Sequence, residues 1–464
     1  MSVLQATESK DLGRSKPRRV PRHRKSEYLN THEYRAGLLK YLLLPCDLRG
    51  ALCIQKKFAS LDENTVVTKV KRSKNKSELR SGFTTGACAA AASRAAVQTL
   101  LTSHQPDYIS ITLPNGEPAT FKVAFIHMTK QTVTASVIKD AGDDPDCTHE
   151  AHIQCIARWQ PTPGFTIEGG VGVARVTLPG LELPVGEAAI NPVPRKNILD
   201  MVMLEWNQST SSQRQAAGMS LEICVPDGEE RAKETIGPRL GLIGGISILG
   251  TRGTVKPYST SAFSASVRQS VQIAQQNGQN HLVLTTGSRT EKSAMTMLPD
   301  YPSMCFIQAG DFVGVGLRSA KRYQVDKVTV VAMIGKLGKM VAGHMMTHVS
   351  GKAIDFSLLA DLAIQAGESS DFANEVRQAN TGRHVLEIWK DAQSTRSAPN
   401  PLFLSVLCQQ AAEHAAIYVK HAVSIEFKLI DFNGDLLAEH ACPKGDIPKT
   451  PDSSNTHATQ QEAQ

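Results

Sequence analysis

Short apolar runs alternate with longer segments of helical periodicity in the second half of this 464-residue chain, and this alternation constrains the fold more than any other feature. The strand-like runs lie at residues 281–285, 304–309 and 327–334. The helical segments lie at residues 262–277, 291–298, 311–322 and 337–348. Parallel strands need long crossover connections, which are usually helices, so this order predicts a parallel sheet covered by helices. A terminal hairpin is expected around Asn433 and Gly434.

The first half of the chain has a different pattern, in which helices and short strands follow one another without regular alternation. Helices are expected at residues 89–96 and from about residue 198. Strands are expected at residues 108–113, 120–126, 132–139 and 220–225. This pattern is typical of an α+β domain. The chain is therefore predicted to combine α+β and α/β classes in two domains, an N-terminal α+β domain (78–238) followed by a Rossmann-like α/β domain with a parallel sheet (239–440).

Positive charge is concentrated at the N-terminus. Eight Lys and Arg residues but only two acidic residues lie within residues 1–26, and the whole chain carries a net charge of +7. We expect residues 1–77 to be a basic, largely disordered leader with one possible helix, and residues 441–464 to be a disordered tail. The rest of the chain is close to neutral and shows no nucleic-acid module, so no nucleic-acid partner is expected.

Features of membrane and secreted proteins are not found in the sequence. No apolar run reaches the ~18 residues that a membrane span needs, and no signal peptide is evident. The nine cysteines are scattered without a CxxC pair, which is typical of cytosolic proteins. We therefore expect a cytoplasmic protein with no membrane partner, and its oligomeric state stays open.

Thr84, Thr85 and Gly86 form a turn directly before the alanine-rich helix. A threonine can cap a helix, and glycine lets a ligand approach the N–H groups at the helix N-terminus. The turn is therefore either an ordinary capped helix or part of an anion-binding site.

Two other segments combine glycine with positive charge. Residues 241–253 contain five glycines, which either let backbone N–H groups converge on a ligand or form a flexible connection between two domains. Lys336 and Lys339 follow the strand at 327–334, at the start of a helix. Lysine is unfavourable there against the helix dipole, so these lysines either bind an anion or are solvated. Arg80 and Arg195 are further cations near glycine- or proline-rich turns.

Carboxylates cluster directly after the strand at 132–139. Asp143 and Asp144 lie beside a glycine and a proline, with His149 close behind. This loop is either a solvated acidic turn or a place that handles protons or a metal. A superficial zinc set is present in Cys147, His149, His152 and Cys155. Its spacing matches no common structural zinc site, so no metal is predicted.

Several motifs together resemble the signature set of the cobalt-precorrin-5B (C1)-methyltransferase family. They are Arg80–Ala92, Gly142–Asp146 with Thr148 and His149, Val185–Arg195, Gly245–Gly250 and Ile334–Leu337. The resemblance implies methyl transfer from S-adenosylmethionine to ring carbon C1 of cobalt-precorrin-5B, which gives cobalt-precorrin-6A in anaerobic cobalamin (vitamin B12) biosynthesis. The cobalt belongs to the small-molecule tetrapyrrole substrate, whose side chains carry many carboxylates.

We assign hypothetical roles in this reaction to residues of the polar loops and the cationic, glycine-rich turns. The candidate catalytic residues, which would move protons, are Asp143, Asp144 and His149. The candidate substrate-binding residues are Arg80, Thr84, Thr85, Gly86, Arg195, Lys336 and Lys339. The candidate residues for binding S-adenosylmethionine are Gly244, Gly245, Gly250 and Gly253.

Two alternatives belong to other functional classes. A nicotinamide-dependent corrin-ring reductase needs a dinucleotide fingerprint followed ~20 positions later by an acidic residue, and no clean fingerprint is present. A non-catalytic tetrapyrrole carrier binds the corrinoid but not S-adenosylhomocysteine.

Overall fold

The computed structural model describes residues 79–210, 214, 216–348, 353–395 and 400–445. All of them belong to the second of the chain's two units, Lys74–Gln464. The predicted leader (1–77), with its possible helix, and all but the first residues of the predicted tail lie outside this description. Within it, helices and mixed sheets confirm the predicted α/β character of the chain.

A six-stranded sheet is formed by residues of the first half of the chain, in the order β2-β3-β4-β5-β9-β6. Its strands are β2 (Tyr108–Thr112), β3 (Pro118–Met128), β4 (Thr132–Ile138), β5 (His152–Gln160), β6 (Gly164–Gly169) and β9 (Gly218–Cys224). Neighbouring strands are antiparallel, except that β6 and β9 run parallel. The sequence pattern predicts β2, β3, β4 and β9 but not β5 and β6.

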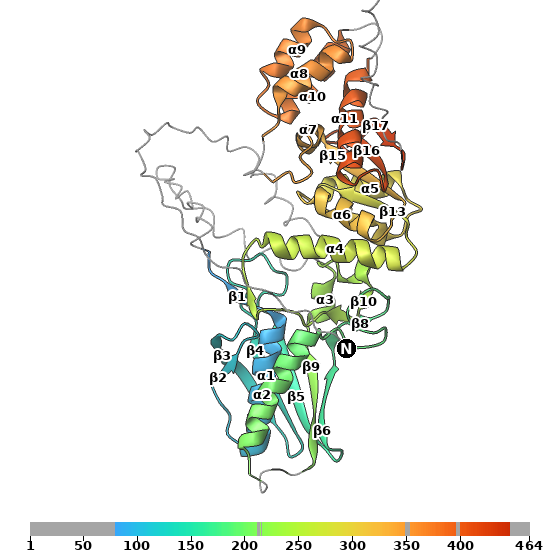
Figure 1. The fold of residues 1–464 in the computed structure, drawn as a ribbon. Helices are drawn as coiled ribbons and strands as arrows, with labels where there is room; N and C mark the ends of the chain where they lie inside the picture. Colours follow the sequence, from blue (N-terminus) through green and yellow to red (C-terminus); the bar gives the residue numbers. More distant parts are fainter. Residues whose placement is uncertain (1–78, 211–213, 215, 349–352, 396–399, 446–464) are drawn as a thin grey trace, which may run out of the picture. The chain divides into compact units, whose positions relative to one another are not determined.

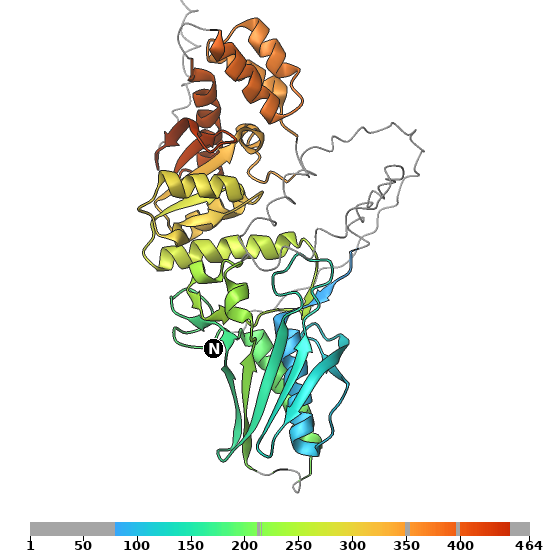
Figure 2. The same cartoon turned by 180° about the vertical axis from the view of Figure 1, so that it is seen from behind.

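Helices α1 (Thr85–Thr102) and α2 (Pro192–Gln208) lie on one face of this sheet (Figure 1). Figure 2 shows the opposite face, which is not covered by any described helix. The whole stretch Thr85–Ser93 is buried, because its small side chains let α1 pack closely against both the sheet and α2. A Cβ atom added to Gly86 would lie 2.7 Å from Cγ of Pro194 in α2, so the two helices start side by side.

Three pairs of short strands lie close to the start of α1. They are β1 (Gly82–Phe83) with β12 (Thr254–Val255), β7 (Gly172–Val173) with β11 (Gly245–Ile246), and β8 (Arg175–Val176) with β10 (Leu242–Ile243). Residues 242–255 therefore pair with strands that precede residue 238, although the predicted domain boundary follows that residue. Helix α3 (Gly228–Ala232) and the 3-10 helix η3 (Gly237–Leu240) connect β9 to this region.

A five-stranded sheet in the order β14-β13-β15-β16-β17 follows. Its strands are β13 (His281–Thr285), β14 (Phe306–Gln308), β15 (Lys327–Met333), β16 (Ser424–Ile430) and β17 (Leu436–Cys442). The first four strands in this order are parallel, as the alternating pattern predicts, and β16 and β17 form the expected antiparallel hairpin. The connecting helices are α4 (Thr260–Gln276), α5 (Ser288–Met297), α6 (Val313–Arg322) and α7 (Ile334–Val341).

The helix expected at 337–348 is shorter than predicted, because α7 ends at Val341 and Gly343 adopts a φ of 78°. Between α7 and β16, where no element is predicted, the structure has four helices. They are α8 (Phe356–Gln365), α9 (Ser370–Arg377), α10 (Gly382–Ser394) and α11 (Leu402–Tyr418). Helix α11 packs against β16 and β17 with Phe403, Leu404 and Leu407 fully buried. No helix in the described part of the chain is long and apolar enough to cross a membrane.

Candidate functional site

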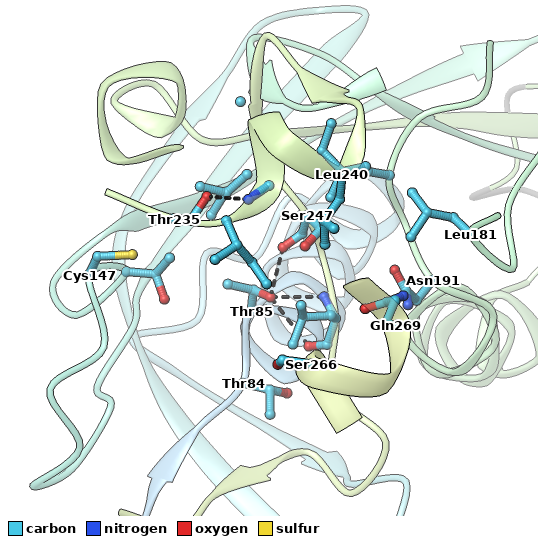
Figure 3. A pocket seen from close by; sticks show the side chains of 18 of the residues that line it. Thr84, Thr85, Cys147, Leu181, Asn191, Thr235, Leu240, Ser247, Ser266 and Gln269 are labelled. Carbon is cyan, nitrogen blue, oxygen red and sulfur yellow. Dashed lines mark hydrogen bonds between the residues drawn. The ribbon is translucent and has the colours of Figure 1, made fainter. Parts of the chain in front are cut away.

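A cavity of about 270 Å³ lies at the N-terminal end of α1 (Figure 3). Segments that are far apart in the sequence line it. They are the start of α1, the loop after β4, residues 181–191, the segment around η3, residues 245–249, and Ser266 and Gln269 of α4. Most of the surface of the wall is apolar, and polar side chains, among them Lys139, Asp146 and Glu182, are interspersed in it. This composition is typical of small-molecule binding sites.

The turn that precedes α1 is a capped helix start, and it also lines the cavity. Thr84 Oγ1 accepts a hydrogen bond from the N–H of Ala87 at 3.2 Å. Thr85 Oγ1 accepts one from the N–H of Leu249 at 2.9 Å, which ties α1 to the glycine-rich segment. The N–H of Gly86 donates to the carbonyl of Leu249 at 3.0 Å. Because the N–H groups of Gly86 and Ala87 are already paired, an anion could be bound here only through other groups.

The glycine-rich segment 241–253 is ordered into the short strands β10 and β11, so a flexible connection is the wrong interpretation. Its glycines allow close packing. A Cβ atom at Gly245 would overlap the backbone of Gly172, and one at Gly250 would overlap Thr84. Of the four glycines predicted to bind the methyl donor, Gly245 lines the cavity. Gly244, Gly250 and Gly253 are not among its lining residues.

An ion pair that the sequence analysis does not single out forms one wall of the cavity. Lys139 Nζ lies 2.6 Å from Asp146 Oδ2, and the Lys139 side chain is only 1% exposed. Asp146 Oδ1 accepts hydrogen bonds from the N–H and the hydroxyl of Thr148, at 2.7 and 2.6 Å. Burial disfavours ionisation of Asp146, but Lys139 and these hydrogen bonds outweigh it, so the pKa of Asp146 is lowered.

Cys147 also lines the cavity, next to this ion pair. Burial and the neighbouring carboxylate of Asp146 raise the pKa of its thiol. The thiol therefore stays protonated near neutral pH and is a poor nucleophile.

Two side-chain amides form another part of the wall, Asn191 and Gln269 (Figure 3). Asn191 is the N-cap residue of α2, but its side chain makes no capping hydrogen bond. No described residue hydrogen-bonds to either side-chain amide. These two amides are therefore available to a ligand.

The three predicted catalytic side chains hold loops together instead of lining the cavity. Each accepts a hydrogen bond from a backbone N–H: Asp143 from Arg80 at 2.7 Å, Asp144 from Tyr258 at 2.9 Å, and His149 from Ala141 at 3.1 Å. The cavity is lined by other residues of the same loop, Asp146–Thr148. The catalytic role of Asp143, Asp144 and His149 stays a prediction.

The predicted substrate-binding arginines both have partners within the protein. The Arg80 guanidinium forms two hydrogen bonds with the Asp140 carboxylate on the surface, and these bonds lower the pKa of Asp140 to about 2. Arg195 Nη1 donates to the carbonyl of Ile167 at 2.8 Å. Neither arginine lines the cavity.

The predicted substrate-binding lysines lie in α7, beyond the carboxyl end of β15. Lys336 Nζ lies 3.2 Å from Asp311 Oδ1 and 2.6 Å from the carbonyl of Thr286. Lys339 Nζ donates to the carbonyl of Thr347 at 3.0 Å. The carboxylate of Asp311 therefore supplies a negative charge beside Lys336 near the start of α7. Lys339 lies in the last turn of this short helix, where the helix dipole favours a positive charge, so the expected conflict with the dipole is wrong for Lys339. These lysines are not among the residues that line the cavity.

Metal-binding arrangements were sought across the described residues, and no group of three or more His, Cys, Asp or Glu side chains is placed to hold an ion. In the superficial zinc set, Cys155 is fully buried in β5. His152 Nδ1 hydrogen-bonds to the Ser136 hydroxyl at 3.0 Å.

Known proteins similar to this chain agree with one another. The family model described as CbiD matches residues 72–257, and the model described as CbiD, C-terminal domain matches residues 346–441. A curated relative named cobalt-precorrin-5B C(1)-methyltransferase, from Geobacillus sp. (strain WCH70), is 45% identical over 78% of this chain and 97% of its own length. A relative of the same name from Leptospira interrogans is 43% identical over 78% of this chain and 96% of its own length.

A solved structure is also similar, that of the cobalamin biosynthesis protein (cbiD) from Archaeoglobus fulgidus. It is 22% identical, covers 68% of this chain and 84% of its own, and superimposes with a TM-score of 0.31. A TM-score this low does not establish a common arrangement of the two folds.

Proposed function

The chain belongs to the CbiD family, and we propose on this premise that it methylates carbon C1 of cobalt-precorrin-5B in cobalamin biosynthesis. The observation that carries the proposal is the 45% identity to a curated C(1)-methyltransferase over 97% of that protein's length. The relatives' names describe methyl transfer, and they support neither a nicotinamide-dependent reductase nor a tetrapyrrole carrier.

The proposed methyl donor is S-adenosylmethionine. In the reaction, C1 of the macrocycle supplies an electron pair to the methyl carbon, and the bond from that carbon to sulfur breaks with its electrons left on sulfur. The products are the C1-methylated corrinoid, S-adenosylhomocysteine and the proton that the methyl group replaces. An in-line displacement of this kind depends mainly on alignment of the two reactants, which a rigid cavity provides. The cobalt enters with the substrate.

The residue roles remain part of the proposal. Arg80, Arg195, Lys336 and Lys339 would exchange their present internal partners for carboxylates of the macrocycle. Thr84, Thr85 and Gly86 would contact the substrate at the start of α1. The donor would lie against the glycine-rich segment, where Gly245 lines the cavity and Gly244, Gly250 and Gly253 would shape the backbone beside it.

Asp143, Asp144 and His149 would handle protons, since methylation of a ring carbon can require proton movement. Unchanged turnover of both Asp144→Asn and His149→Ala would contradict this role. We also propose that residues 78–238 and 239–440 form two domains. The parallel strand order β14-β13-β15-β16 supports a Rossmann-like second domain.

The proposed activity is tested by anaerobic incubation of the purified full chain with cobalt-precorrin-5B and donor labelled in its methyl group. Mass spectrometry of the corrinoid should show a product heavier by one labelled methyl group in place of one hydrogen. Heat-denatured protein provides the control. An unchanged corrinoid in the presence of folded protein and intact donor would contradict the proposal.

A further inference from the structure

We propose that the cavity binds the methyl donor in one orientation, with its adenine on the amides of Asn191 and Gln269 and its amino-acid group on the Lys139–Asp146 ion pair. The inference rests on the proposed function and deepens it. It assigns four residues for which the sequence predicts no role, and it separates the donor site from the site of the macrocycle.

The size of the cavity favours the donor over the macrocycle. Its volume of about 270 Å³ is close to the lower limit of about 300 Å³ for sites that bind drug-sized molecules. A nucleoside linked to an amino acid is a ligand of that class. A tetrapyrrole macrocycle with its acetate and propionate side chains is several times larger, so at most one of its arms could enter.

The amide end of the cavity suits a purine base. A side-chain amide presents a donor and an acceptor side by side, and adenine presents the complementary acceptor and donor on its ring nitrogen and amino group. Asn191 and Gln269 line the cavity, and no described residue hydrogen-bonds to either side chain. An asparagine at an N-cap usually accepts a hydrogen bond from its own helix, but Asn191 does not. Apolar side chains nearby, Leu181 and Leu240, could contact the faces of the flat ring (Figure 3).

The ionic end suits an amino acid that carries both charges. The ammonium of Lys139 has three hydrogens to donate, and among the described residues Asp146 is its one hydrogen-bond partner. The Lys139 side chain lines the cavity but is only 1% exposed, so bulk water does not hydrate its ammonium, and a small shift of the side chain would present its other two donors to a ligand. A carboxylate from the donor's amino acid supplies the missing acceptors. The α-ammonium of that amino acid would pair with Asp146.

The two ends are separated within the cavity. Cys147, the neighbour of Asp146, lies on one side of the view in Figure 3, and Asn191 and Gln269 lie on the other. Thr85 lies between them. A ligand that spans both ends therefore holds its middle, the sulfonium centre with the reactive methyl group, near the start of α1.

Binding of two ligands by the full chain tests this orientation. Isothermal titration calorimetry would use S-adenosylhomocysteine and 5′-methylthioadenosine, which retains the base but lacks the amino acid. Gln269→Leu should lower the affinity for both ligands by about tenfold, which is the effect expected when one or two hydrogen bonds are lost. The double variant Lys139→Met/Asp146→Asn should weaken S-adenosylhomocysteine by about tenfold or more and leave 5′-methylthioadenosine within about twofold.

Matched control variants show whether an effect is specific to the cavity, and the double variant avoids a loss of folding. Lys130→Met and Gln131→Leu make the same kinds of change in the exposed β3–β4 turn and should alter neither affinity. Neutralising Lys139 and Asp146 together avoids an unpaired buried charge, so the variant is expected to fold. Thermal unfolding of each variant checks this before titration.

The outcomes separate the inference from the proposed function. If the wild-type chain binds no S-adenosylhomocysteine, the proposed methyl transfer itself is contradicted. If the wild-type chain binds it and both cavity variants bind it equally well, the donor site is wrong and the proposed function stands. If Gln269→Leu leaves the affinity for 5′-methylthioadenosine unchanged while the double variant lowers it, the proposed orientation is wrong.

Discussion

Lys139 donates a hydrogen bond of 2.6 Å to Asp146 in the wall of the cavity, although its side chain is only 1% exposed. A buried ion pair adds little to stability compared with apolar residues of the same volume, because both charges lose their hydration. In the binding mode proposed above, this pair also contacts the ligand. The stability of variants and the binding of ligands can be measured independently.

Loss of one partner of this pair should destabilise the fold far more than loss of both. Lys139→Met leaves the Asp146 carboxylate partly buried and without its counter-charge, which should lower the free energy of unfolding by about 3 kcal/mol. Lys139→Met/Asp146→Asn should lie within about 1 kcal/mol of the wild type. Urea unfolding followed by circular dichroism measures both. If the single and double variants were destabilised equally, the Lys139–Asp146 ion pair would be contradicted.

The pKa of Asp140 should be about 2 and should depend on Arg80, whose guanidinium hydrogen-bonds to it. Arg80→Gln should return this pKa towards its ordinary value of 3.8. A lowered carboxyl pKa stabilises the folded state above the unfolded pKa, and this effect is lost as the pH falls through about 2. The carboxyl carbon chemical shift, followed by NMR during an acid titration, reports the pKa directly. If the pKa of Asp140 in the variant equals that in the wild type, Arg80 is not the cause of the lowered pKa.

His281 should make the fold less stable in mild acid. Burial, and to a lesser degree the nearby charge of Lys327, lower its pKa to about 4. Between about pH 6.5 and pH 4 the unfolded chain binds a proton that the folded chain does not, so stability falls as the pH falls. The loss is at most about 3 kcal/mol. In His281→Gln, the free energy of unfolding should change less with pH over this range. Urea unfolding at several pH values measures it, and a slope against pH equal to that of the wild type would contradict the role of His281.

Two glycines of the segment 241–253 should differ in their tolerance of alanine. Both have positive φ, 85° for Gly244 and 137° for Gly250, but Gly244 has open space where Cβ would be placed. Gly244→Ala should cost about 1 kcal/mol for the backbone conformation alone. Gly250→Ala must also displace Thr84 and should cost about 3 kcal/mol or more. Thermal unfolding of the two variants compares them, and equal costs would mean that the contact with Thr84 is unimportant.

The sequence predicts the elements whose pattern is local. The strand at 281–285 coincides with β13, and the hairpin around Asn433 and Gly434 is present, because buried apolar runs and turn residues are visible within a short window. Strand β5 also has alternating burial, but the sequence analysis does not predict this strand, because it considers His152 and Cys155 as possible metal ligands. An interval of three residues places these two on opposite faces of a strand, so the alternation was the better signal.

The cavity could not be predicted in the same way. Lys139 is one lysine at the end of a strand, and nothing in its neighbourhood distinguishes it from a solvated residue. Asn191 and Gln269 are far apart in the sequence and meet the same cavity only after α2 and α4 are in place. The motifs identify the region, since Thr84, Thr85 and Gly245 all line it. The polar groups that give the cavity its two ends come from tertiary packing.

If the chain methylates one ring carbon, the transferred methyl carbon must be found at that position of the product. The full chain would be incubated anaerobically with cobalt-precorrin-5B and S-adenosylmethionine carrying a 13C-labelled methyl group. The isolated corrinoid would then be examined by 13C NMR with correlations across several bonds. We expect one enriched methyl signal correlated with ring carbon C1. Enrichment at any other ring position, or label that stays entirely in the donor, would contradict it.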